Sequence, residues 1–459
     1  MNLSSILKHK GIDSILVYSN SKSDIIQKIN AIQPDIIAYS LMYGYHWRYI
    51  ELSKEIKQKY PNIYQIAGGP YTTFYPESIN ELPLGAIAIG EADISLADFV
   101  GAFKGDGPSA DHTRGFHYRS KDRVIKGNLQ NLLDNLDELP FPDREIFYEQ
   151  DSLLRNQEFK SFLSGRGCPF PCTYCFNHKF NTMFKGKGKV MRKKSADYFI
   201  AEIKDTKEKY GCQIAIFEDD IFVMKKDWLE KFCRNFKKEI NIPYICYVRA
   251  DIVDEGTLRL LKESGCHIVR MAIETGNEKL RNTILKRNMK DETIIKAADL
   301  IHKYGMKLSV SNMVGLPTET LDALEDTLNL NIRCRPEHPS AQFFMPYPDM
   351  ELSKIAIETG YFSEERMKEI PKNTWKNTPL LFDKETKRVM VKTQKIFPLI
   401  VKYPSIKKYT KLFFLLPDQL LYLVSVVTKI TIVRNYFPPT KVTLLQRLRV
   451  LRRFFSFYG

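Results

Sequence analysis

The sequence predicts an α/β protein in which an N-terminal parallel sheet is followed by a partial (β/α)6 barrel and a helical C-terminal segment. Two observations support this prediction. Short apolar runs alternate with helix-like segments in residues 1–105, and a strand-then-helix pattern repeats from about residue 151 to residue 350. Residues 106–150 are expected to form a linker, and residues 351–459 a helical, basic C-terminal region.

Length and composition are those of an ordinary globular protein with two or three domains. The chain has 459 residues, of which 44% are hydrophobic and 27% charged. Five cysteines are scattered singly without the spacing of a disulfide framework, so a reducing cytoplasm is the expected compartment: Cys212, Cys233, Cys246, Cys266 and Cys334. The N-terminus has no apolar signal-peptide core, and no run of roughly 20 apolar residues could span a membrane.

Four apolar runs in the N-terminal region are predicted strands of a Rossmann-like sheet: Ile12–Tyr18, Asp35–Tyr39, Ile63–Ala67 and Ala86–Ile89. An amphipathic stretch from Tyr49 to Tyr60 separates two of them, which is typical of a βαβ unit. Small or polar residues follow the strands, at the edge where open α/β sheets bind ligands: Ser40, Gly68-Gly69-Pro70 and Gly90-Glu91. These glycines can equally serve only to make tight turns. In the linker we expect a small hairpin near residues 115–125, followed by an extended spacer stiffened by Pro140 and Pro142.

The six predicted barrel strands are Phe159–Leu163, Gln213–Phe217, Tyr244–Val248, His267–Ala272, Lys307–Met313 and Ala341–Met345. Between them lie four predicted helices: Ser195–Tyr210, Lys226–Lys238, Thr257–Glu263 and Asp291–Tyr304. Ser195 and Asp291 are predicted N-caps. Gly211, Gly265 and Gly305 stand where a left-handed residue is expected to end a helix.

Three cysteines, Cys168, Cys172 and Cys175, lie within eight residues after the first barrel strand. Grouped thiolates select zinc, copper(I) or an iron–sulfur cluster. A zinc tetrahedron lacks a fourth Cys or His at a pairing distance, apart from His178 just beyond. Three ligands on a four-iron cluster would leave one iron open to a small molecule. The alternatives are a structural zinc knot and three unrelated core cysteines.

The conspicuous polar and Gly/Pro groups of the barrel follow its strands, which is where barrels of this kind place their chemistry: Glu218-Asp219-Asp220, Arg249-Ala-Asp251, Glu274-Thr-Gly-Asn277, Gly315-Leu-Pro-Thr-Glu319 and Pro346-Tyr-Pro348. Scattered structural residues would have fallen at both ends of the strands. The sequence therefore predicts one site at the carboxyl rim.

The C-x3-C-x2-C spacing resembles that of the radical S-adenosylmethionine (SAM) enzymes, and residues 1–360 resemble the subgroup with an N-terminal cobalamin-binding-like domain. The N-terminal stretches that carry the resemblance are Pro34–Ser40, Ala67–Pro70 and Gly90-Glu91. There is no D-x-H-x-x-G motif, so the resemblance nominates no histidine as a cobalt ligand. The first strand of that family is expected to be missing here.

The resemblance implies a [4Fe–4S] cluster on Cys168, Cys172 and Cys175, together with SAM and, if the N-terminal domain binds it, cobalamin. In this family the reduced cluster passes one electron to SAM, which gives methionine and a 5′-deoxyadenosyl radical that abstracts hydrogen from an unactivated carbon. An electron donor such as flavodoxin or ferredoxin is therefore an expected partner. Methyl transfer to carbon is the expected outcome with cobalamin, and oxidation, cyclisation or rearrangement without it. A non-catalytic iron–sulfur or zinc module is the alternative, although a ferredoxin-type centre uses four cysteines per cluster.

SAM presents an ammonium, a carboxylate, a ribose and an adenine, and the rim offers a candidate for each. We expect Asp219 or Asp220 at the ammonium, Arg249 at the carboxylate, Glu274 at the ribose, Gly315 and Pro317 along the adenine, and Tyr174 packed on the purine. Each of these can instead be a rim salt bridge or a turn residue. Cys246 lies on the third strand, where it could face the barrel interior.

The basic character of the chain lies in its tail. The net charge is +15, and from Val401 to Gly459 eleven Lys and Arg residues stand against Asp418 as the single acid. Two stretches, Lys411–Val427 and Leu444–Phe455, are strongly apolar, and the second interleaves leucines with arginines. Such a tail either closes the open side of the partial barrel or docks on an anionic membrane near a lipid-like substrate. A small-molecule or lipid-like substrate is expected, and no nucleic-acid partner.

Overall fold

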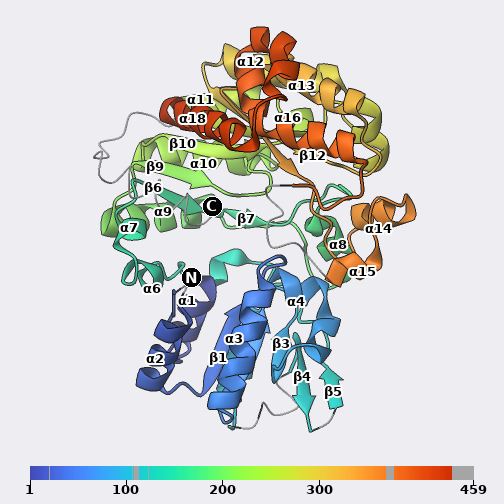
Figure 1. The fold of residues 1–459 in the computed structure, drawn as a ribbon. Coiled ribbons are helices and arrows are strands. Elements are labelled where there is room, and N and C mark those ends of the chain that lie inside the picture. The colour runs from blue at the N-terminus through green and yellow to red at the C-terminus, as the bar shows by residue number, and fades with distance from the viewer. Residues whose placement is uncertain (20, 106, 108–112, 122, 369–376, 437–459) are drawn as a thin grey trace.

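The computed structural model describes the chain except for residues 20, 106, 108–112, 122, 369–376 and 437–459. An N-terminal sheet and a larger C-terminal sheet each carry their own helices, and the carboxyl ends of the N-terminal strands are directed toward the larger domain (Figure 1). This arrangement confirms the predicted α/β class, with an N-terminal sheet, a six-stranded partial barrel and C-terminal helices.

The N-terminal sheet has five strands in the order β1-β2-β3-β4-β5. Three are parallel: β1 (Ile36–Ser40), β2 (Tyr64–Gly68) and β3 (Ala86–Ala88). The hairpin predicted in the linker is formed by β4 (Phe116–Ser120) and β5 (Arg123–Lys126), and β4 pairs antiparallel with β3, so the hairpin extends this sheet. The helices of this part are α1 (Asn2–His9), α2 (Lys22–Ile32), α3 (His46–Lys59), α4 (Pro70–Phe74) and α5 (Ser95–Gly101), with the 3-10 turn η1 (Pro76–Asn80).

The strand predicted at Ile12–Tyr18 was wrong, because this segment has no regular secondary structure. Its backbone forms hydrogen bonds to the linker instead. The Tyr18 amide donates to Gln150 Oε1 at 3.4 Å, and Gln150 Nε2 donates to the Leu16 carbonyl. Ile15 is 63% exposed. An apolar run alone does not distinguish a strand from a segment that lies over the surface of another element.

The linker contains η3 (Leu136–Glu138), α6 (Glu145–Tyr148) and α7 (Ser152–Arg155). The larger sheet follows, and all six predicted strands are confirmed: β6 (Phe159–Phe162), β9 (Ile214–Phe217), β10 (Tyr244–Val248), β11 (Cys266–Glu274), β12 (Lys307–Val314) and β13 (His338–Phe343). They are parallel and adjacent in chain order, with β6 and β13 at the two edges, so the barrel is left open.

The other elements of this domain are β7 (Gly165–Arg166), α8 (Phe176–Met183), β8 (Arg192–Lys193), α9 (Ala196–Tyr210), α10 (Lys226–Glu239), η4 (Ala250–Ile252), α11 (Glu255–Glu263), η5 (Leu280–Ile284), α12 (Asp291–Lys303) and α13 (Leu321–Cys334). Ser195 caps α9 by accepting from the Tyr198 amide, as predicted. Gly211, Gly265 and Gly305 have the positive φ expected of them. The N-cap prediction for Asp291 was wrong: Lys290 is the N-cap, because the Asp291 carboxylate is drawn to the buried Arg281 guanidinium.

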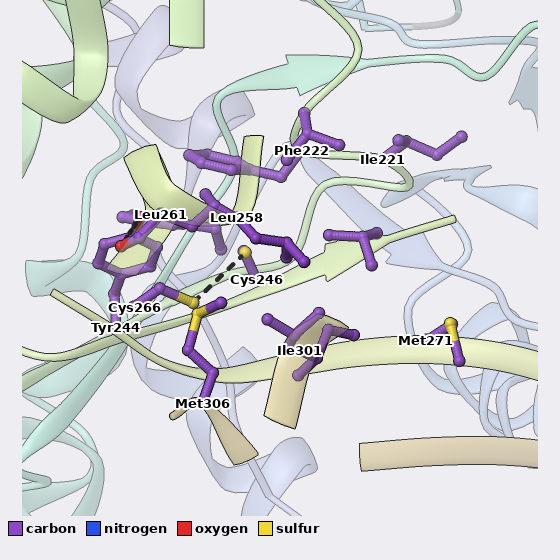
Figure 2. Packing of buried hydrophobic residues seen from close by; sticks show 14 of the residues in the cluster. Ile221, Phe222, Tyr244, Cys246, Leu258, Leu261, Cys266, Met271, Ile301 and Met306 are labelled. Atoms are coloured by element: carbon purple, nitrogen blue, oxygen red, sulfur yellow. Dashed lines mark hydrogen bonds between the residues drawn. The ribbon is translucent and has the colours of Figure 1, made fainter. Parts of the chain in front are cut away.

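The main core lies between the six-stranded sheet and its helices. Figure 2 shows part of it, with Cys246 and Cys266 packed among Leu258 and Leu261 of α11 and their sulfurs 3.9 Å apart. Cys246 is fully buried on the helix-facing side of the sheet, not in the barrel interior. Burial raises the pKa of its thiol well above the usual range, which fits a packing role.

The C-terminal region is helical, as expected. It consists of α14 (Glu351–Glu358), α15 (Glu364–Lys368), α16 (Lys384–Lys402), η7 (Pro404–Tyr409), α17 (Thr410–Phe413) and α18 (Asp418–Tyr436). Helices α16 and α18 pack on each other and on edge strand β13. Within the described part of the chain, no helix is long and apolar enough to cross a membrane. The stretch Leu444–Phe455 lies outside the described residues.

Candidate active site

The cysteine loop leaves the sheet through a short antiparallel pair, β7 with β8, in which Arg166 lies opposite Arg192. Gly167 follows with a φ of 86°, and a Cβ on it would lie 2.0 Å from the Val190 carbonyl oxygen, so only glycine fits. The loop is then held from two sides. The Thr173 hydroxyl donates to the Ile284 carbonyl at 2.7 Å, and the Asn181 amide donates to the Cys168 carbonyl at 2.8 Å.

The three cysteine thiols of the loop converge. All three are free, and Cys172 is buried. Burial raises the pKa of Cys175 to about 12, and the negative charges of Asp220, Cys172 and Cys168 add to this effect, which requires the groups to be close together. Among the described residues, no group of three His, Cys, Asp or Glu side chains is preformed to hold a single metal ion. Cysteine thiolates grouped in one loop are the ligands that iron–sulfur clusters use.

Arg249, at the end of β10, lies against the cysteine loop. Its Nη1 donates to Cys172 Sγ at 3.6 Å, and its guanidinium lies 3.8 Å from the centre of the Phe170 ring. Its Nε donates to both carboxylate oxygens of Asp251, at 2.8 and 3.1 Å, and its Nη2 donates to the Arg287 carbonyl. The guanidinium is therefore fixed in place beside a cysteine sulfur.

Glu274, Tyr174 and Arg287 form a buried group at the end of β11. The Tyr174 hydroxyl donates to Glu274 Oε1 at 2.9 Å, and Arg287 donates to that hydroxyl and lies 3.7 Å from the same carboxylate oxygen. Burial raises the pKa of Glu274, and Arg287 opposes that rise. Glu274 has a φ of 71°, a left-handed conformation that a non-glycine residue adopts at a cost and that clusters at functional sites.

The two adjacent acids at the end of β9 have different environments. Asp219 is buried and accepts from the Ser164 amide at 3.0 Å and from Lys193 Nζ at 3.3 Å, so it fixes the start of the cysteine loop. Asp220 is exposed and close enough to Cys168 and Cys175 to contribute to the raised pKa values of both thiols. Of the two, Asp220 faces the cysteines.

Gly315 and Pro317 follow β12 and are buried. A Cβ on Gly315 would lie 2.8 Å from Thr378 Oγ1, so this turn is covered by the C-terminal region. The Glu319 carboxylate accepts from the Gly315 and Leu316 amides, the latter at 3.1 Å, and so holds the turn from inside. Tyr174 packs with Leu316 in one apolar cluster, which places the cysteine loop next to this turn.

The N-terminal domain contacts the cysteine loop directly. Glu91, after β3, accepts from Arg166 Nη1 at 2.9 Å and from Arg192 Nη1 at 2.8 Å, and Asp93 accepts from Arg166 Nη2 at 3.1 Å. Burial by itself would raise the pKa of Glu91, but Arg192 and Arg166 lower it overall. These charge-assisted bonds fix the carboxyl ends of the N-terminal strands against the β7–β8 strand pair, whose two strands lie before and after the cysteine loop in the sequence.

Aromatic side chains line the same side of the N-terminal domain. The His46 imidazole stacks on the Tyr71 ring at 4.1 Å and near the Tyr43 ring at 5.5 Å. Tyr43 also lies 5.2 Å from Tyr347 of the larger domain, and Phe74 lies 5.9 Å from Phe176 beside the cysteine loop. A planar cofactor held at the strand ends would meet flat apolar surfaces here, which fits a corrin ring better than a small polar ligand.

Arg166, Arg192 and Arg287 are site residues that the sequence did not nominate, and Glu319 was named without its role. Arg287 follows η5, in a segment without a motif, and only its contacts with Tyr174 and Arg249 bring it to the site. Glu319 was recognised as part of the turn after β12, but not as the residue whose carboxylate accepts hydrogen bonds from the amides of that turn. An acidic residue two positions after the proline of Gly-x-Pro could have indicated this role.

Comparison with known protein families agrees with this geometry. Residues 162–330 match the radical SAM superfamily, and residues 1–100 match the B12 binding domain. The first range contains all three loop cysteines together with Asp220, Arg249 and Glu274. The second contains strands β1 to β3, whose ends face the loop.

Individual relatives are distant. An uncharacterized methyltransferase of Pyrococcus horikoshii is 26% identical over 338 residues, which cover 73% of this chain and 72% of that protein. The anaerobic magnesium-protoporphyrin IX monomethyl ester cyclase of Rubrivivax gelatinosus is 24% identical over 72% of this chain and 60% of its own length. The radical SAM methyltransferase TsrM of Kitasatospora setae, solved with tryptophan and a SAM analogue, has a TM-score of 0.63 at 13% identity, covering 78% of this chain and 72% of that one. At this identity the structural likeness shows the fold alone.

The cofactors implied by the resemblance are confirmed at the level of these families: a [4Fe–4S] cluster and SAM for the radical SAM domain, and cobalamin, which the sequence left conditional, for the N-terminal domain. The individual SAM contacts expected at the rim stay predictions. The chain combines a radical SAM domain with an N-terminal B12-binding domain, and it is a radical SAM enzyme of the cobalamin-binding type.

Proposed function

We propose that this enzyme transfers a methyl group to a carbon atom of an organic substrate, small or lipid-like, in a cobalamin-dependent radical reaction. The supporting observation is that the three-cysteine loop and the carboxyl ends of the N-terminal strands face each other and are fixed by Arg166 and Arg192 on Glu91. When bound, the cluster and SAM supply radical chemistry, and cobalamin supplies methyl transfer. The chain itself binds and orients these groups and excludes water.

In this proposal, the rim residues contact different parts of SAM. Asp220, exposed beside Cys168 and Cys175, accepts from the SAM ammonium, while Asp219 holds the loop through Ser164 and Lys193. Arg249 meets the SAM carboxylate from its position on Cys172. Glu274 accepts from the ribose hydroxyls. Gly315 and Pro317 contact the adenine through backbone, and Tyr174 positions Glu274.

Cobalamin binds without a protein imidazole on cobalt in this proposal. The sequence has no D-x-H-x-x-G motif to supply such an imidazole, and His46, which begins α3, is stacked on Tyr71. Bound cob(II)alamin should therefore give an electron paramagnetic resonance spectrum without nitrogen superhyperfine splitting from a protein ligand. Such splitting, abolished by His46→Phe, would contradict the proposal.

Oxidative cyclisation is the second candidate function, favoured by the similarity over 72% of this chain to a porphyrin-ring cyclase. The two functions differ in what becomes of SAM. A cobalamin-dependent methyltransferase forms S-adenosylhomocysteine in addition to 5′-deoxyadenosine, whereas radical cyclisation alone requires only the latter.

The test uses anaerobically reconstituted protein with a flavodoxin or ferredoxin donor, with and without cobalamin. Cys168→Ala, Cys172→Ala or Cys175→Ala should each abolish SAM cleavage, because each removes one of three cluster ligands. The matched controls are Cys→Ala variants of the five other cysteines, which should keep the cluster: Cys212, Cys233, Cys246, Cys266 and Cys334. A Cys172→Ala protein that retains four irons and cleaves SAM would end the cluster assignment. S-adenosylhomocysteine that forms equally without cobalamin would refute the methyltransferase proposal alone.

A further inference from the structure

Helix α18 is apolar on the side that faces water. Its buried positions are Leu421, Ser425, Thr428 and Ile432, which recur at helical spacing and face α16 and β13. Two of these four are small hydroxyl residues. The opposite side of the helix carries the larger apolar set: Leu420, Leu423, Val427 and Ile430, exposed by 50, 58, 55 and 42%. A helix whose apolar stripe faces its own domain normally shows the reverse distribution.

The exposed apolar surface continues into the preceding segment. Leu412 of α17 is 60% exposed, and Leu415, in the turn before α18, is 78% exposed. Three tyrosines, Tyr403, Tyr409 and Tyr422, are 49, 48 and 43% exposed in the same region. We call this surface, from Leu412 to Ile430, the α17–α18 face. Single exposed leucines are common, but so many exposed apolar side chains within one short segment favour an interaction surface.

Along residues 401–436, which include this face, every charged residue except Asp418 is basic. Lys408 and Lys411 are exposed just before it, with Lys408 Nζ 4.9 Å from the Tyr409 ring centre, and Lys429 lies on α18. The single acid from Val401 onward, Asp418, is paired with Lys395 at 3.0 Å. An occupant of this face must therefore offer both an apolar interior and an anionic rim.

We propose that the α17–α18 face docks on an anionic lipid leaflet. Exposed aliphatic side chains on a helix, flanked by tyrosines and lysines, have the composition of a helix that lies in the membrane interface. Leucines enter the acyl region, tyrosines stay at the headgroup level, and lysines contact lipid phosphates. The helix lies on the surface and does not span, in agreement with the hydropathy of the described helices. The proposal does not depend on the reaction catalysed.

The test is flotation of the full-length holoenzyme with phosphatidylcholine vesicles and with vesicles that also contain phosphatidylglycerol. Wild type should bind the anionic vesicles, with less binding as salt concentration rises. The triple variant Leu420→Gln, Leu423→Gln, Val427→Gln changes only exposed side chains. Its affinity for anionic vesicles should fall by a factor of at least about ten. A variant with Lys408→Gln and Lys411→Gln should lose the preference for anionic over neutral vesicles.

The matched control is Ile125→Gln, which removes an apolar side chain that is 41% exposed on β5 of the other domain, and it should bind vesicles as wild type does. Negligible flotation of wild type with both vesicle types would overturn the proposal. So would a triple variant that floats as well as wild type, because the attachment would then lie elsewhere in the chain. Concentration-dependent dimers that the triple variant abolishes, without vesicle binding, would instead assign the face to a second copy. SAM cleavage by each variant, measured without vesicles, should equal that of wild type.

Discussion

Glu319 should make the stability of the radical SAM domain fall as pH rises toward neutrality. Burial raises the pKa of its carboxyl from 4.5 to about 7, although hydrogen bonds from the Leu316 and Gly315 amides oppose the rise. The second carboxylate oxygen, Oε1, is buried and has no hydrogen-bond partner among the described residues. The ionised form is therefore costly in the folded protein, because two amide donors replace only part of its hydration.

The size and direction of this effect follow from linkage. Because the pKa of Glu319 is higher in the folded protein than in the unfolded chain, its contribution to stability is full below about pH 4.5 and is lost as pH rises to about 7. At about 1.4 kcal/mol per pH unit, a pKa gap from 4.5 to about 7 corresponds to about 3 kcal/mol. Glu319→Gln keeps an oxygen for the two amides and cannot ionise. The free energy of unfolding of the variant, relative to wild type, should therefore increase by about 2 to 3 kcal/mol between about pH 5 and about pH 8.

Urea unfolding of reduced, cluster-free protein, followed by circular dichroism at several pH values, measures this difference. Glu230→Gln, an exposed substitution on α10, is the matched control and should stay within about 0.5 kcal/mol of wild type. A difference between Glu319→Gln and wild type that is constant across pH, or that shrinks as pH rises, would refute the reasoning.

Two further predictions concern strained or buried positions of the same domain. Thr318 is β-branched and has a φ of 65°, so Thr318→Gly should raise the free energy of unfolding by about 0.5 to 1 kcal/mol, measured by urea unfolding. Thr320→Gly should instead lower the free energy of unfolding by a few tenths of a kcal/mol, because Thr320 caps α13. If both glycine variants change the free energy of unfolding in the same direction, the strain argument is contradicted. Arg287→Met leaves Glu274 buried without its cation and should lower the free energy of unfolding by about 3 to 5 kcal/mol, as well as weaken SAM binding measured by equilibrium dialysis. Arg287→Lys should restore part of the stability but not the bond to Tyr174, and a fully stable Arg287→Met protein that binds SAM normally would show that the group is dispensable.

Local spacing determined much of what could be predicted. The three cysteines are predicted as cluster ligands because they lie close together in the sequence, so the loop can be nominated before any folding is considered. The barrel strands are also largely local: short runs rich in apolar residues, such as β9, which is buried at every position, alternate with helices. Because parallel strands bring their carboxyl ends to one rim, the polar groups that follow them are predicted to meet. Glu274 and Arg249 do contact the cysteine loop, at Tyr174 and Cys172 respectively.

Only the tertiary structure decided the orientation and partners of these groups. Asp219 and Asp220 are equivalent in the sequence, but successive residues at a strand end point in opposite directions, so one holds Ser164 and the other faces the thiols. Arg287 reaches Tyr174 from 113 residues away, and no sequence pattern records a contact of that range. Ile12–Tyr18 has the composition of a strand but bonds to Gln150, because pairing depends on which sheet edge is available. For α18, composition shows that the helix is apolar, and only packing on α16 and β13 decides that Leu420, Leu423 and Val427 face outward. Composition and spacing act along the chain, whereas burial, charge pairing and exposed faces depend on distances that exist only after folding.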